Sequence, residues 1–520
     1  MTVTSRVIIV GGGISGLAVA HRLTELSRER QVPLDITVLE SQNRFGGVIE
    51  TVERDGFILE GGPDAFLAEK PWARDLCRRV GLERELIETQ RESRRSFIVH
   101  RGKLLPVPEG FYLIAPSSLS AVFQLPFLSW RGRIRMACEP FVPVRAEEQD
   151  ESVGSFIARR FGRETLTRIG QPMIAGIYTA DPDRLSLQAT MPTFHEMERQ
   201  HGSVIRALRV RARASNGRSV STPPSGPPPQ AGGPRWWCRL LRVGGMSPHA
   251  GRLMVPPRRL AGWGSTSGPR YGLFLSLRRG MGSLVEALMR QMHGVTLHHS
   301  SPVTRIALSG CAWTVTLHDG RTLHADRLCL ALPADKAATL LEPCARDLAR
   351  QLAEIPYESV ATVNLGFRQA DAPQALAGFG FVIPASEGRQ LVGCTFSSVK
   401  FSGRAPQGMV LVRAFVGGAL HRELFRLDDA AMAQMVREEL RDLLGIRADP
   451  VTLAVHRYPH AMPQYHVGHL ARVAAIEETA RRYPGLHLAG NGFRGLGLPD
   501  CIRQAEQTAA DIMASATPVG

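Results

Sequence analysis

A glycine-rich segment near the amino terminus constrains the fold of this chain more than any other feature. The apolar run Val7–Val10 reads as a buried strand, and a Gly-x-Gly-x-x-Gly turn at 11–16 follows it directly. A helix of small and apolar residues comes next, and a second strand, Ile36–Leu39, ends on Glu40. Such glycines let the backbone approach a pyrophosphate at a helix N-terminus, and the acid accepts hydrogen bonds from a ribose. The segment predicts a dinucleotide-binding βαβ unit.

The residues after Glu40 indicate which dinucleotide binds. Arg44, Gly46 and Gly47 complete an Arg-x-Gly-Gly tail. A Gly-x-Gly-x-x-Gly turn alone is a weak signal, but strand, helix, acid and tail together are specific. The tail resembles that of the flavoprotein group of amine oxidases, phytoene desaturases and protoporphyrinogen oxidases. The arginine and second glycine pair also serve the flavin pyrophosphate in that group, so the resemblance implies FAD rather than NAD.

The net charge of +15 invites a nucleic-acid partner, but its distribution argues against one. Residues 199–285 contain fifteen arginines and no Asp, Glu or Lys. The rest of the chain carries 48 basic and 48 acidic residues and is balanced. Because the excess lies in one segment, we expect no nucleic-acid partner.

A break in composition at 214–270 lies within that basic segment. The 57 residues hold ten Gly and ten Pro, too many for a packed element, and they show no periodicity. We expect a disordered Pro/Gly/Arg-rich insert. A basic arm for anionic lipid or nucleic acid, and a recently acquired or out-of-frame stretch, stay open as alternatives.

The 520 residues predict more than one domain with ample core. The eight cysteines show no metal-binding spacing, which is typical of reduced thiols in a cytoplasmic protein. We expect no signal peptide and no membrane span, since Val7 already enters a strand and no apolar run is long enough.

Residues 109–143 are apolar, punctuated by proline and edged by Arg131, Arg133 and Arg135. Two interpretations stay open. The segment either lies on a membrane as an amphipathic surface or forms the wall of an apolar substrate site.

The remaining segments alternate between strand and helix patterns. Residues 97–107 suggest a hairpin, and 301–333 a β-meander closed by a strand. Strand patterns at 357–458 predict a second sheet, with a charged helix at 428–444. We also expect a helix within 171–186 that breaks at Gly176.

Several segments together resemble the oxygen-dependent, FAD-containing protoporphyrinogen oxidase family. The resemblance spans about 5–212 and 271–512. Its marks are GPDAF (62–66), GIYTADPDRLS (176–186), FLSLRRGM (274–281), GFGFVIP (378–384), GCTFSSVKFSGRAP (393–406), PQYHVGH (463–469) and LAGNGFRGLGLPDCI (488–502).

The resemblance implies one non-covalently bound FAD per chain. Cys501, which follows the last motif, fits the family's non-covalent pattern rather than a tethered flavin. The implied cofactor-binding residues are Gly11, Gly12, Gly13, Ile14, Ser15, Gly16, Glu40, Ser41, Arg44, Gly46, Gly47, Gly61, Gly62, Val303, Gly490, Gly495, Gly497 and Leu498.

The resemblance implies fewer residues for the substrate than for the cofactor. Gly176 matches a glycine whose carbonyl faces the tetrapyrrole N–H groups. Leu365, Phe381 and Phe396 match apolar walls of the macrocycle, although plain core is the alternative for each. The family's propionate-binding arginine is replaced here by Ser96, and we assign its role to the neighbouring Arg95.

The family's chemistry belongs to the flavin, which accepts hydride at N5 from the meso carbons of a porphyrinogen and is reoxidised by oxygen or another acceptor. We therefore assign no catalytic acid or base and no metal. His456, His460, His466 and His469 cluster in sequence, and we interpret them as a loop near the flavin rather than a metal site.

The function implied is FAD-dependent oxidation of protoporphyrinogen IX to protoporphyrin IX in haem biosynthesis. The alternatives are coproporphyrinogen III oxidation, a flavin amine oxidase and an inactive flavin-binding fold. We expect a cytoplasmic protein; contact with the inner face of the cell membrane and a homodimer stay open.

The fold class expected is α/β, a Rossmann-like FAD-binding domain with α+β insertions. The domains predicted are FAD binding at 1–93, 271–338 and 482–520, mixed-sheet substrate binding at 94–108 and 339–481, a helical domain at 109–213 whose membrane association stays open, and the insert at 214–270.

Overall fold

The computed structural model describes residues 4–93, 95–108, 110–147, 149–216, 274–372 and 376–516. The predicted insert at 214–270 lies outside the described residues from 217 onward, and so does Arg94.

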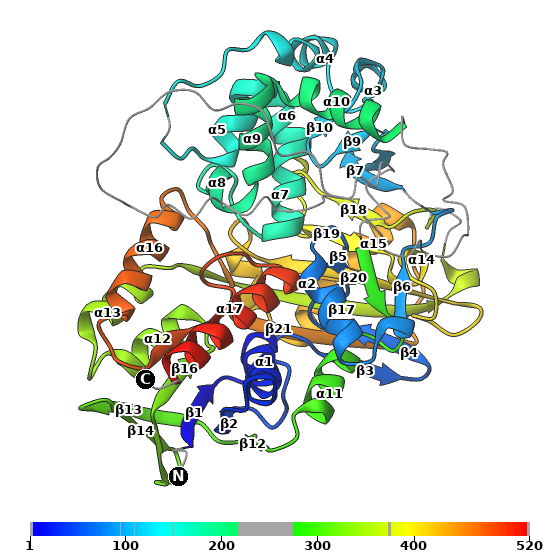
Figure 1. Cartoon of the computed structure of the whole chain (residues 1–520). Helices are drawn as coiled ribbons and strands as arrows, with labels where there is room; N and C mark the ends of the chain where they lie inside the picture. Colours follow the sequence, from blue (N-terminus) through cyan, green and yellow to red (C-terminus); the bar gives the residue numbers. More distant parts are fainter. Residues whose placement is uncertain are drawn as a thin grey trace, which may run out of the picture. The chain divides into compact units, whose positions relative to one another are not determined.

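A five-stranded parallel sheet carries the amino-terminal glycine motif (Figure 1). Alternate residues of its central strand face opposite ways: Val7 and Ile9 join one core cluster, and Ile8 and Val10 join another. Apolar residues on both faces require cover on both faces, which explains the continuous apolar run in the sequence. The strand order is β12 (Val295–His298), β2 (Leu34–Leu39), β1 (Ser5–Val10), β16 (Arg327–Leu330) and β22 (Leu486–Leu488).

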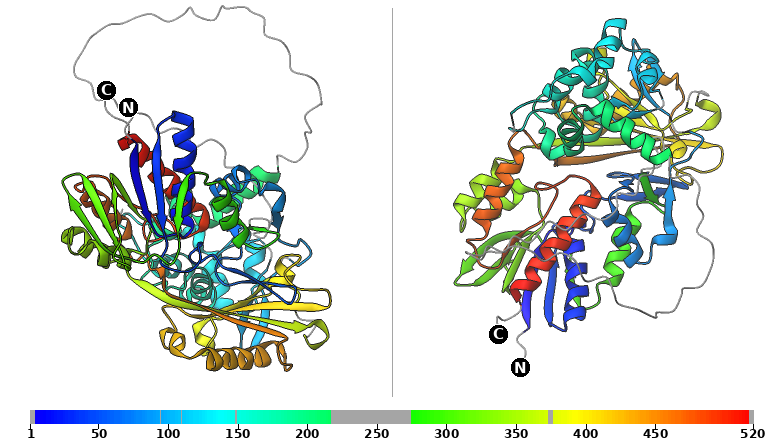
Figure 2. Two further views of the ribbon diagram at one scale, coloured as in Figure 1. Left: turned by 90° about the horizontal axis from the view of Figure 1, so that it is seen from below. Right: turned by 45° about the horizontal axis from the view of Figure 1, so that its top comes forward.

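Helices from both ends of the chain cover one face of this sheet. Helix α1 (Ile14–Arg30) packs along α17 (Leu498–Ala516), and α11 (Gly282–Gln291) lies beside α1 (Figure 2). The core cluster of the other face draws on the β-meander, the helix pair that follows it and a helix near the carboxyl end. These elements are β13 (Val303–Ser309), β14 (Ala312–Leu317), β15 (Thr322–Ala325), α12 (Ala334–Leu341), α13 (Arg346–Ala353) and α16 (His469–Ala480).

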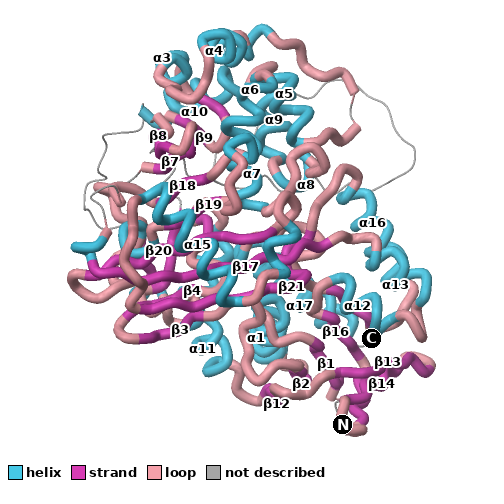
Figure 3. Tube along the Cα trace, turned by 180° about the vertical axis from the view of Figure 1, so that it is seen from behind, coloured by secondary structure: helices cyan, strands magenta, loops and turns pink. Residues whose placement is uncertain are grey.

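A seven-stranded mixed sheet forms the second sheet layer (Figure 3). Only β18 and β7 run parallel among its paired strands in the described residues. Helix α15 (Asp429–Leu444) covers one face, and the Asp428 carboxylate caps it by accepting the Ala431 N–H. The order is β21 (Thr452–Pro463), β17 (Tyr357–Arg368), β20 (Met409–Gly417), β19 (Gly393–Thr395), β18 (Gly380–Val382), β7 (Ser96–His100) and β8 (Lys103–Pro106).

Short strands connect the two sheet layers. They are β3 (Thr51–Arg54) with β4 (Phe57–Glu60), and β5 (Phe66–Leu67) and β6 (Leu86–Glu88) with β11 (Phe274–Leu277). Helix α2 (Pro71–Arg79) follows β5, and α14 (Ser397–Lys400) precedes β20.

A helical layer has its own apolar core. A buried ion pair joins Arg160 to Glu139, whose carboxylate also accepts the backbone N–H groups of Val204 and Ile205 at the start of α10. Its elements are β9 (Phe111–Tyr112), β10 (Ala115–Pro116), α3 (Leu119–Phe123), α4 (Trp130–Ala137), α5 (Val153–Phe161), α6 (Arg163–Thr165), a π-helical turn at 166–170, α7 (Gln171–Tyr178), α8 (Leu187–Thr190), α9 (Pro192–His201) and α10 (Val204–Asn216).

One expectation about this layer is wrong. The helix does not break at Gly176: α7 continues through it and ends after Tyr178, where Thr179 takes a left-handed conformation. The cost of one glycine in a helix is about 1 kcal/mol, which packing of the α7 apolar face outweighs. Among the described residues, no helix is long and apolar enough to cross a bilayer.

Candidate functional site

The turn after β1 can be built only from glycine at two positions. Gly11 has φ +109°, and a Cβ there would lie 2.3 Å from the Ala331 carbonyl oxygen. A Cβ at Gly16 would lie 1.9 Å from the Gly11 carbonyl oxygen. These glycines therefore serve the turn itself, whatever binds beside it.

The N-terminus of α1 is suited to an anion. Its N-cap, Gly13, offers no side chain to the first-turn N–H groups, and the first turn has no acidic residue. Among the described residues, a Cβ at Gly13 would meet only Gly47 Cα, at 3.8 Å. Unpaired N–H groups at an open helix end, with the positive end of the helix dipole, fit a pyrophosphate.

The second glycine pair packs backbone to backbone against the first. Gly46 N–H donates to the Gly12 carbonyl at 2.8 Å, and a Cβ at Gly47 would lie 3.1 Å from Gly13 Cα. The Arg44 guanidinium donates to the carbonyls of Gly47, at 2.7 Å, and Ile49, at 3.0 Å. Arg44 thus holds the shape of this turn, in addition to the pyrophosphate role that the sequence predicts.

Glu40 lies buried at the end of β2 and orients the glycine turn. Its carboxylate accepts the N–H groups of Gly12 and Gln42, each at 2.8 Å, and the Ser41 hydroxyl at 3.1 Å. A carboxylate has about four lone-pair positions, so three bonds leave capacity for a ribose hydroxyl.

Val303 begins the meander close to Glu40. The Ser301 N–H donates to the Glu40 carbonyl at 2.8 Å, and Val303 opens β13 two residues later. Its expected contact with adenine stays a prediction.

The carboxyl-terminal turn meets the amino-terminal one. Helices α1 and α17, which begin at these two turns, pack along each other. Gly490 and Gly495 have φ of +144° and +118°, and a Cβ at Gly495 would lie 2.5 Å from Asp500 Cβ. Burial raises the pKa of Cys501 to about 12, so its thiol is not poised for a covalent flavin bond.

The turn at Gly61 and Gly62 lies against the seven-stranded sheet. A Cβ at Gly61 would lie 2.4 Å from the Tyr458 hydroxyl, and one at Gly62 would lie 1.7 Å from the Val48 carbonyl oxygen. The Gly61 carbonyl accepts the Thr362 hydroxyl at 2.7 Å. Close neighbours on both sides explain why both positions are glycine.

Polar and charged side chains surround the residues next to this turn. Asn364 donates to the Glu60 carbonyl at 3.1 Å, and burial raises the pKa of the Glu60 carboxyl. Burial alone would also raise the pKa of Asp64, but the positive charges of Lys400, 2.8 Å away, and Arg413 hold it well below its usual range.

Three polar side chains on this sheet face keep unpaired atoms. They are Asn364 Oδ1, Arg413 Nε and His456 Nδ1, from three neighbouring strands, and each is unpaired among the described residues. Buried polar atoms normally have partners, so this face has hydrogen-bonding capacity beside the Gly61 turn for ordered water or a ligand.

The predicted macrocycle walls lie on the opposite face of the same sheet. Leu365, Phe381 and Phe396 are buried in the core beneath α15, and the rings of Phe381 and Phe396 meet edge to face with centroids 6.0 Å apart. Strand residues alternate between faces, so it is Val382 that approaches α7, 3.0 Å from a Cβ built at Gly176. The placement agrees with the core alternative for all three residues.

Gly176 and Arg95 lie on either side of β18. Gly176 is exposed near the end of α7. Arg95 is exposed just before β7, and its carbonyl accepts the Phe379 N–H at 2.7 Å. Leu496 and Tyr178 border the same helical core, which brings the carboxyl-terminal turn to the end of α7.

The four histidines near the carboxyl end face different partners. His456 lies beside Gly61, whereas the His469 imidazole bonds the Phe493 carbonyl at 2.8 Å. No cluster of three metal-binding side chains occurs in the described ranges.

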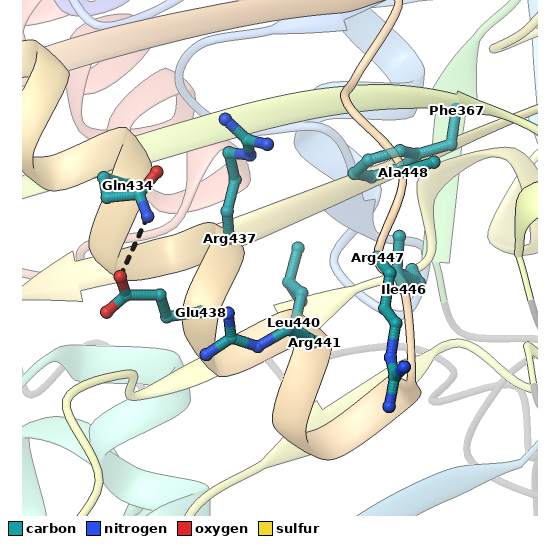
Figure 4. Close-up of a pocket in the computed structure, with 9 residues that line it drawn as sticks. All are labelled: Phe367, Gln434, Arg437, Glu438, Leu440, Arg441, Ile446, Arg447 and Ala448. Atoms are coloured by element: carbon teal, nitrogen blue, oxygen red, sulfur yellow. Dashed lines mark hydrogen bonds between the residues drawn. The ribbon is translucent and has the colours of Figure 1, made fainter.

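A small cavity of about 60 Å³ lies elsewhere, at the outer side of α15 (Figure 4). Its three arginines, Arg437, Arg441 and Arg447, extend in different directions, and Arg437 pairs with Asp449. Because these groups do not converge, the cavity is not a candidate for the cofactor or the substrate.

Several residues around the glycine turns escaped the sequence analysis. Thr362, Asn364 and Arg413 were read only as strand, and Tyr465 only as part of a motif. A single polar residue inside an apolar strand pattern could have indicated such a position, because a buried polar group needs a hydrogen-bond partner.

Substitution of Gly13 separates ligand binding from folding. The site of a Cβ at Gly13 is open in the protein, so Gly13→Val folds but blocks the close approach of a pyrophosphate. We expect normal apoprotein melting and no flavin retained on gel filtration. Gly16→Val serves as the contrast, because its clash with Gly11 lowers apoprotein stability as well. Flavin retention by folded Gly13→Val would contradict the prediction.

His469 makes stability depend on acid pH. Burial, together with the charges of Arg472 and Arg494 and the neighbouring His466, lowers its pKa to about 4. The unfolded chain, with a histidine pKa near 6.5, therefore binds a proton that the folded chain excludes between pH 6.5 and 4. Stability falls as the pH falls through this window, by about 3 kcal/mol.

His469→Gln keeps a donor for the Phe493 carbonyl but does not titrate. We expect urea unfolding at pH 7 and pH 4.5 to show a smaller loss for the variant than for the wild type. Equal losses would contradict the assignment.

Comparison with known proteins gives a family for this arrangement. The family model described as flavin containing amine oxidoreductase matches residues 14–513. The chain is 31% identical to coproporphyrinogen III oxidase of Bacillus subtilis over 98% of this chain and 97% of that protein. It is 29% identical to human protoporphyrinogen oxidase over 98% of both chains.

A solved structure agrees with these relatives. An Exiguobacterium protein provisionally named a protoporphyrinogen oxidase superposes with a TM-score of 0.80 at 28% identity, over 99% of this chain and 100% of that one. The α/β fold, the glycine cradle and the open α1 N-terminus all fit FAD, which is the cofactor of this protein. The chain belongs to the flavin-containing amine oxidoreductase family.

Proposed function

We propose that this protein catalyses the FAD-dependent oxidation of a porphyrinogen to its porphyrin in haem biosynthesis. The observation that carries the proposal is near full-length similarity to porphyrinogen oxidases, combined with glycine turns from both ends of the chain that meet at α1 and α17. FAD held by these turns would supply the two-electron oxidation of the meso carbons, with oxygen as the proposed final acceptor.

The protein's own residues bind and orient in this proposal. The turns at 11–16, 46–47 and 490–498 hold the dinucleotide, with Glu40 toward the ribose and Val303 toward the adenine. The turn at 61–62, fixed by Thr362 and Asn364, faces the flavin ring. The proposed domain ranges are 1–93, 271–338 and 482–520 for the flavin, and 94–108 and 339–481 for the substrate. Helices α13 and α16 of the second set pack against the parallel sheet and belong with the flavin domain.

No side chain is needed as a strong base. Burial raises the pKa of Tyr458 and lowers that of His456, so both are neutral beside Gly61 at physiological pH. Neither of these two side chains therefore carries a charge there, and product aromaticity supplies the driving force.

The substrate side is formed by Gly176 and Val382, with Arg95 available for a propionate at the rim. Leu365, Phe381 and Phe396 support this surface from the far side of the sheet. Truncation of any of the three therefore acts through stability rather than through direct substrate contact.

Coproporphyrinogen III is the second candidate substrate, and the relatives favour it. Proteins named coproporphyrinogen III oxidase from Bacillus subtilis and Propionibacterium freudenreichii are 31% and 33% identical to this chain, above the 29% of the human protoporphyrinogen oxidase.

A fluorescence assay tests both substrates. The purified yellow protein with added FAD is expected to convert a porphyrinogen into a fluorescent porphyrin, with one hydrogen peroxide released for each hydride transferred and therefore three for each porphyrin formed. The mass of the product distinguishes protoporphyrin from coproporphyrin. Bound flavin with no fluorescence gain from either porphyrinogen would reject the proposal.

We further propose that the helical layer contacts a membrane surface. Helices α3 and α4 present the exposed apolar side chains of Phe123, 54% exposed, Trp130, 67% exposed, and Ile134, 47% exposed. Arg131 lies against the Trp130 ring, 5.4 Å from its centroid. Apolar side chains edged by arginine suit the headgroup region of anionic lipid.

The double variant Phe123→Ser/Trp130→Ser tests this contact. We expect the wild type to sediment with phosphatidylglycerol vesicles and the variant to bind about tenfold more weakly, because it loses its largest insertable side chains. Val451→Ser, an exposed apolar position on another element, is the matched control. Equal sedimentation of all three proteins would remove the proposal.

A further inference from the structure

The segment 464–469, between β21 and α16, touches both the helical layer and the carboxyl-terminal glycine turn. The Tyr465 carbonyl accepts the Ser186 N–H at 2.7 Å, and Val467 N–H donates to the Arg184 carbonyl at 3.0 Å. Gly468 N–H donates to the Asp150 carboxylate at 3.1 Å. Three bonds therefore fix this segment to the helical layer.

Side chains of the same segment hold the turn between β22 and α17. The Tyr465 hydroxyl donates to the Asn491 carbonyl at 2.6 Å and accepts the Gly495 N–H at 2.9 Å. The His469 imidazole donates to the Phe493 carbonyl at 2.8 Å. The Tyr465 and His469 side chains thus bond the backbone of every second residue from 491 to 495.

The two side chains also support each other. Their rings stack with centroids 3.8 Å apart and planes 13° from parallel. Tyr465 is 1% exposed and His469 is fully buried, so neither hydroxyl nor imidazole has water as a substitute partner.

We propose that Tyr465 and His469 are positioning residues for FAD: they set the 491–495 turn in its binding conformation and couple that turn to the helical layer. The inference rests on FAD as the cofactor and on the proposed role of the carboxyl-terminal turn, not on the identity of the substrate.

Removal of the Tyr465 hydroxyl has a defined consequence. In Tyr465→Phe the ring and its stacking remain, but the Asn491 carbonyl and the Gly495 N–H lose their partner. Buried backbone groups without partners are unfavourable, so the turn samples other conformations in which they reach water. Because FAD binds only the ordered turn, its apparent affinity falls with the fraction of ordered protein.

The test is a titration of apoprotein with FAD, followed by quenching of flavin fluorescence. We expect the FAD Kd to rise about tenfold in Tyr465→Phe. Tyr483→Phe is the matched control, because it also removes a hydroxyl that bonds a protein group, here Asp347, but lies away from the turn. Its Kd is expected to equal that of the wild type.

A pair of His469 variants gives an independent measurement. His469→Gln retains an N–H donor toward Phe493 and is expected to bind FAD within about threefold of the wild type. His469→Leu removes the donor and is expected to bind about tenfold more weakly. Circular dichroism of each apoprotein verifies folding, so the pair answers the question even where Tyr465→Phe does not fold.

Hydrogen exchange measures the order of the turn itself. A variant that only lowers the overall stability of the protein would not show a change confined to this turn and reversed by FAD. Peptides covering 489–497 are expected to exchange faster in Tyr465→Phe apoprotein and to regain protection at saturating FAD. An unchanged FAD Kd in Tyr465→Phe and in His469→Leu, even with lowered melting temperatures, would overturn the inference. Porphyrinogen turnover is not measured here, so a wrong substrate assignment leaves the result unaffected.

Discussion

The close backbone contact between two glycine turns is the constraint on which the rest of the molecule depends. Gly46 N–H donates to the Gly12 carbonyl, and a Cβ at Gly47 would lie 3.1 Å from Gly13 Cα. Neither contact leaves room for a side chain, and together they leave the N-terminus of α1 open to an anion. The parallel sheet, the α1–α17 pair and the buried Glu40 all serve to hold these turns in place. The N–H groups at a helix end without protein partners must be completed by water or a ligand, and a bound pyrophosphate fits this one.

The two faces of the seven-stranded sheet have different roles. The face beneath α15 is apolar core, whereas the other face presents Thr362, Asn364 and Arg413 to the Gly61 turn. The core face packs the sheet against α15, and hydrogen bonds from the polar face hold the Gly61 turn in place. Buried charges at Asp64 and Lys400 extend this support. Such placement, rather than an acid–base group, suits a protein whose chemistry resides in its flavin.

Much of this arrangement was predictable from local pattern. The Gly-x-Gly-x-x-Gly turn, the meander and the second sheet each carry a period or a turn signal that belongs to neighbouring residues. The registers within the second sheet were not predictable: the sequence left Leu365, Phe381 and Phe396 as either substrate wall or core. All three lie in the core, and alternation along β18 puts Val382 toward Gly176. A shift of one residue reverses the face of a strand residue. Gly176 was likewise read as a helix break, because local propensity does not include the packing that holds α7 together.

By itself the sequence determined the dinucleotide turn, the order of strands and helices, and the family resemblance, because these depend on residues close together in the chain. Only the tertiary structure decided which distant groups meet: Asn364 with Glu60, and Tyr465 with Asn491 and Gly495. Contacts of this kind join residues tens to hundreds of positions apart, and no local periodicity encodes them. The opening glycine motif shows that a cofactor is bound; the folded chain shows how the carboxyl-terminal turn is held ready to meet it.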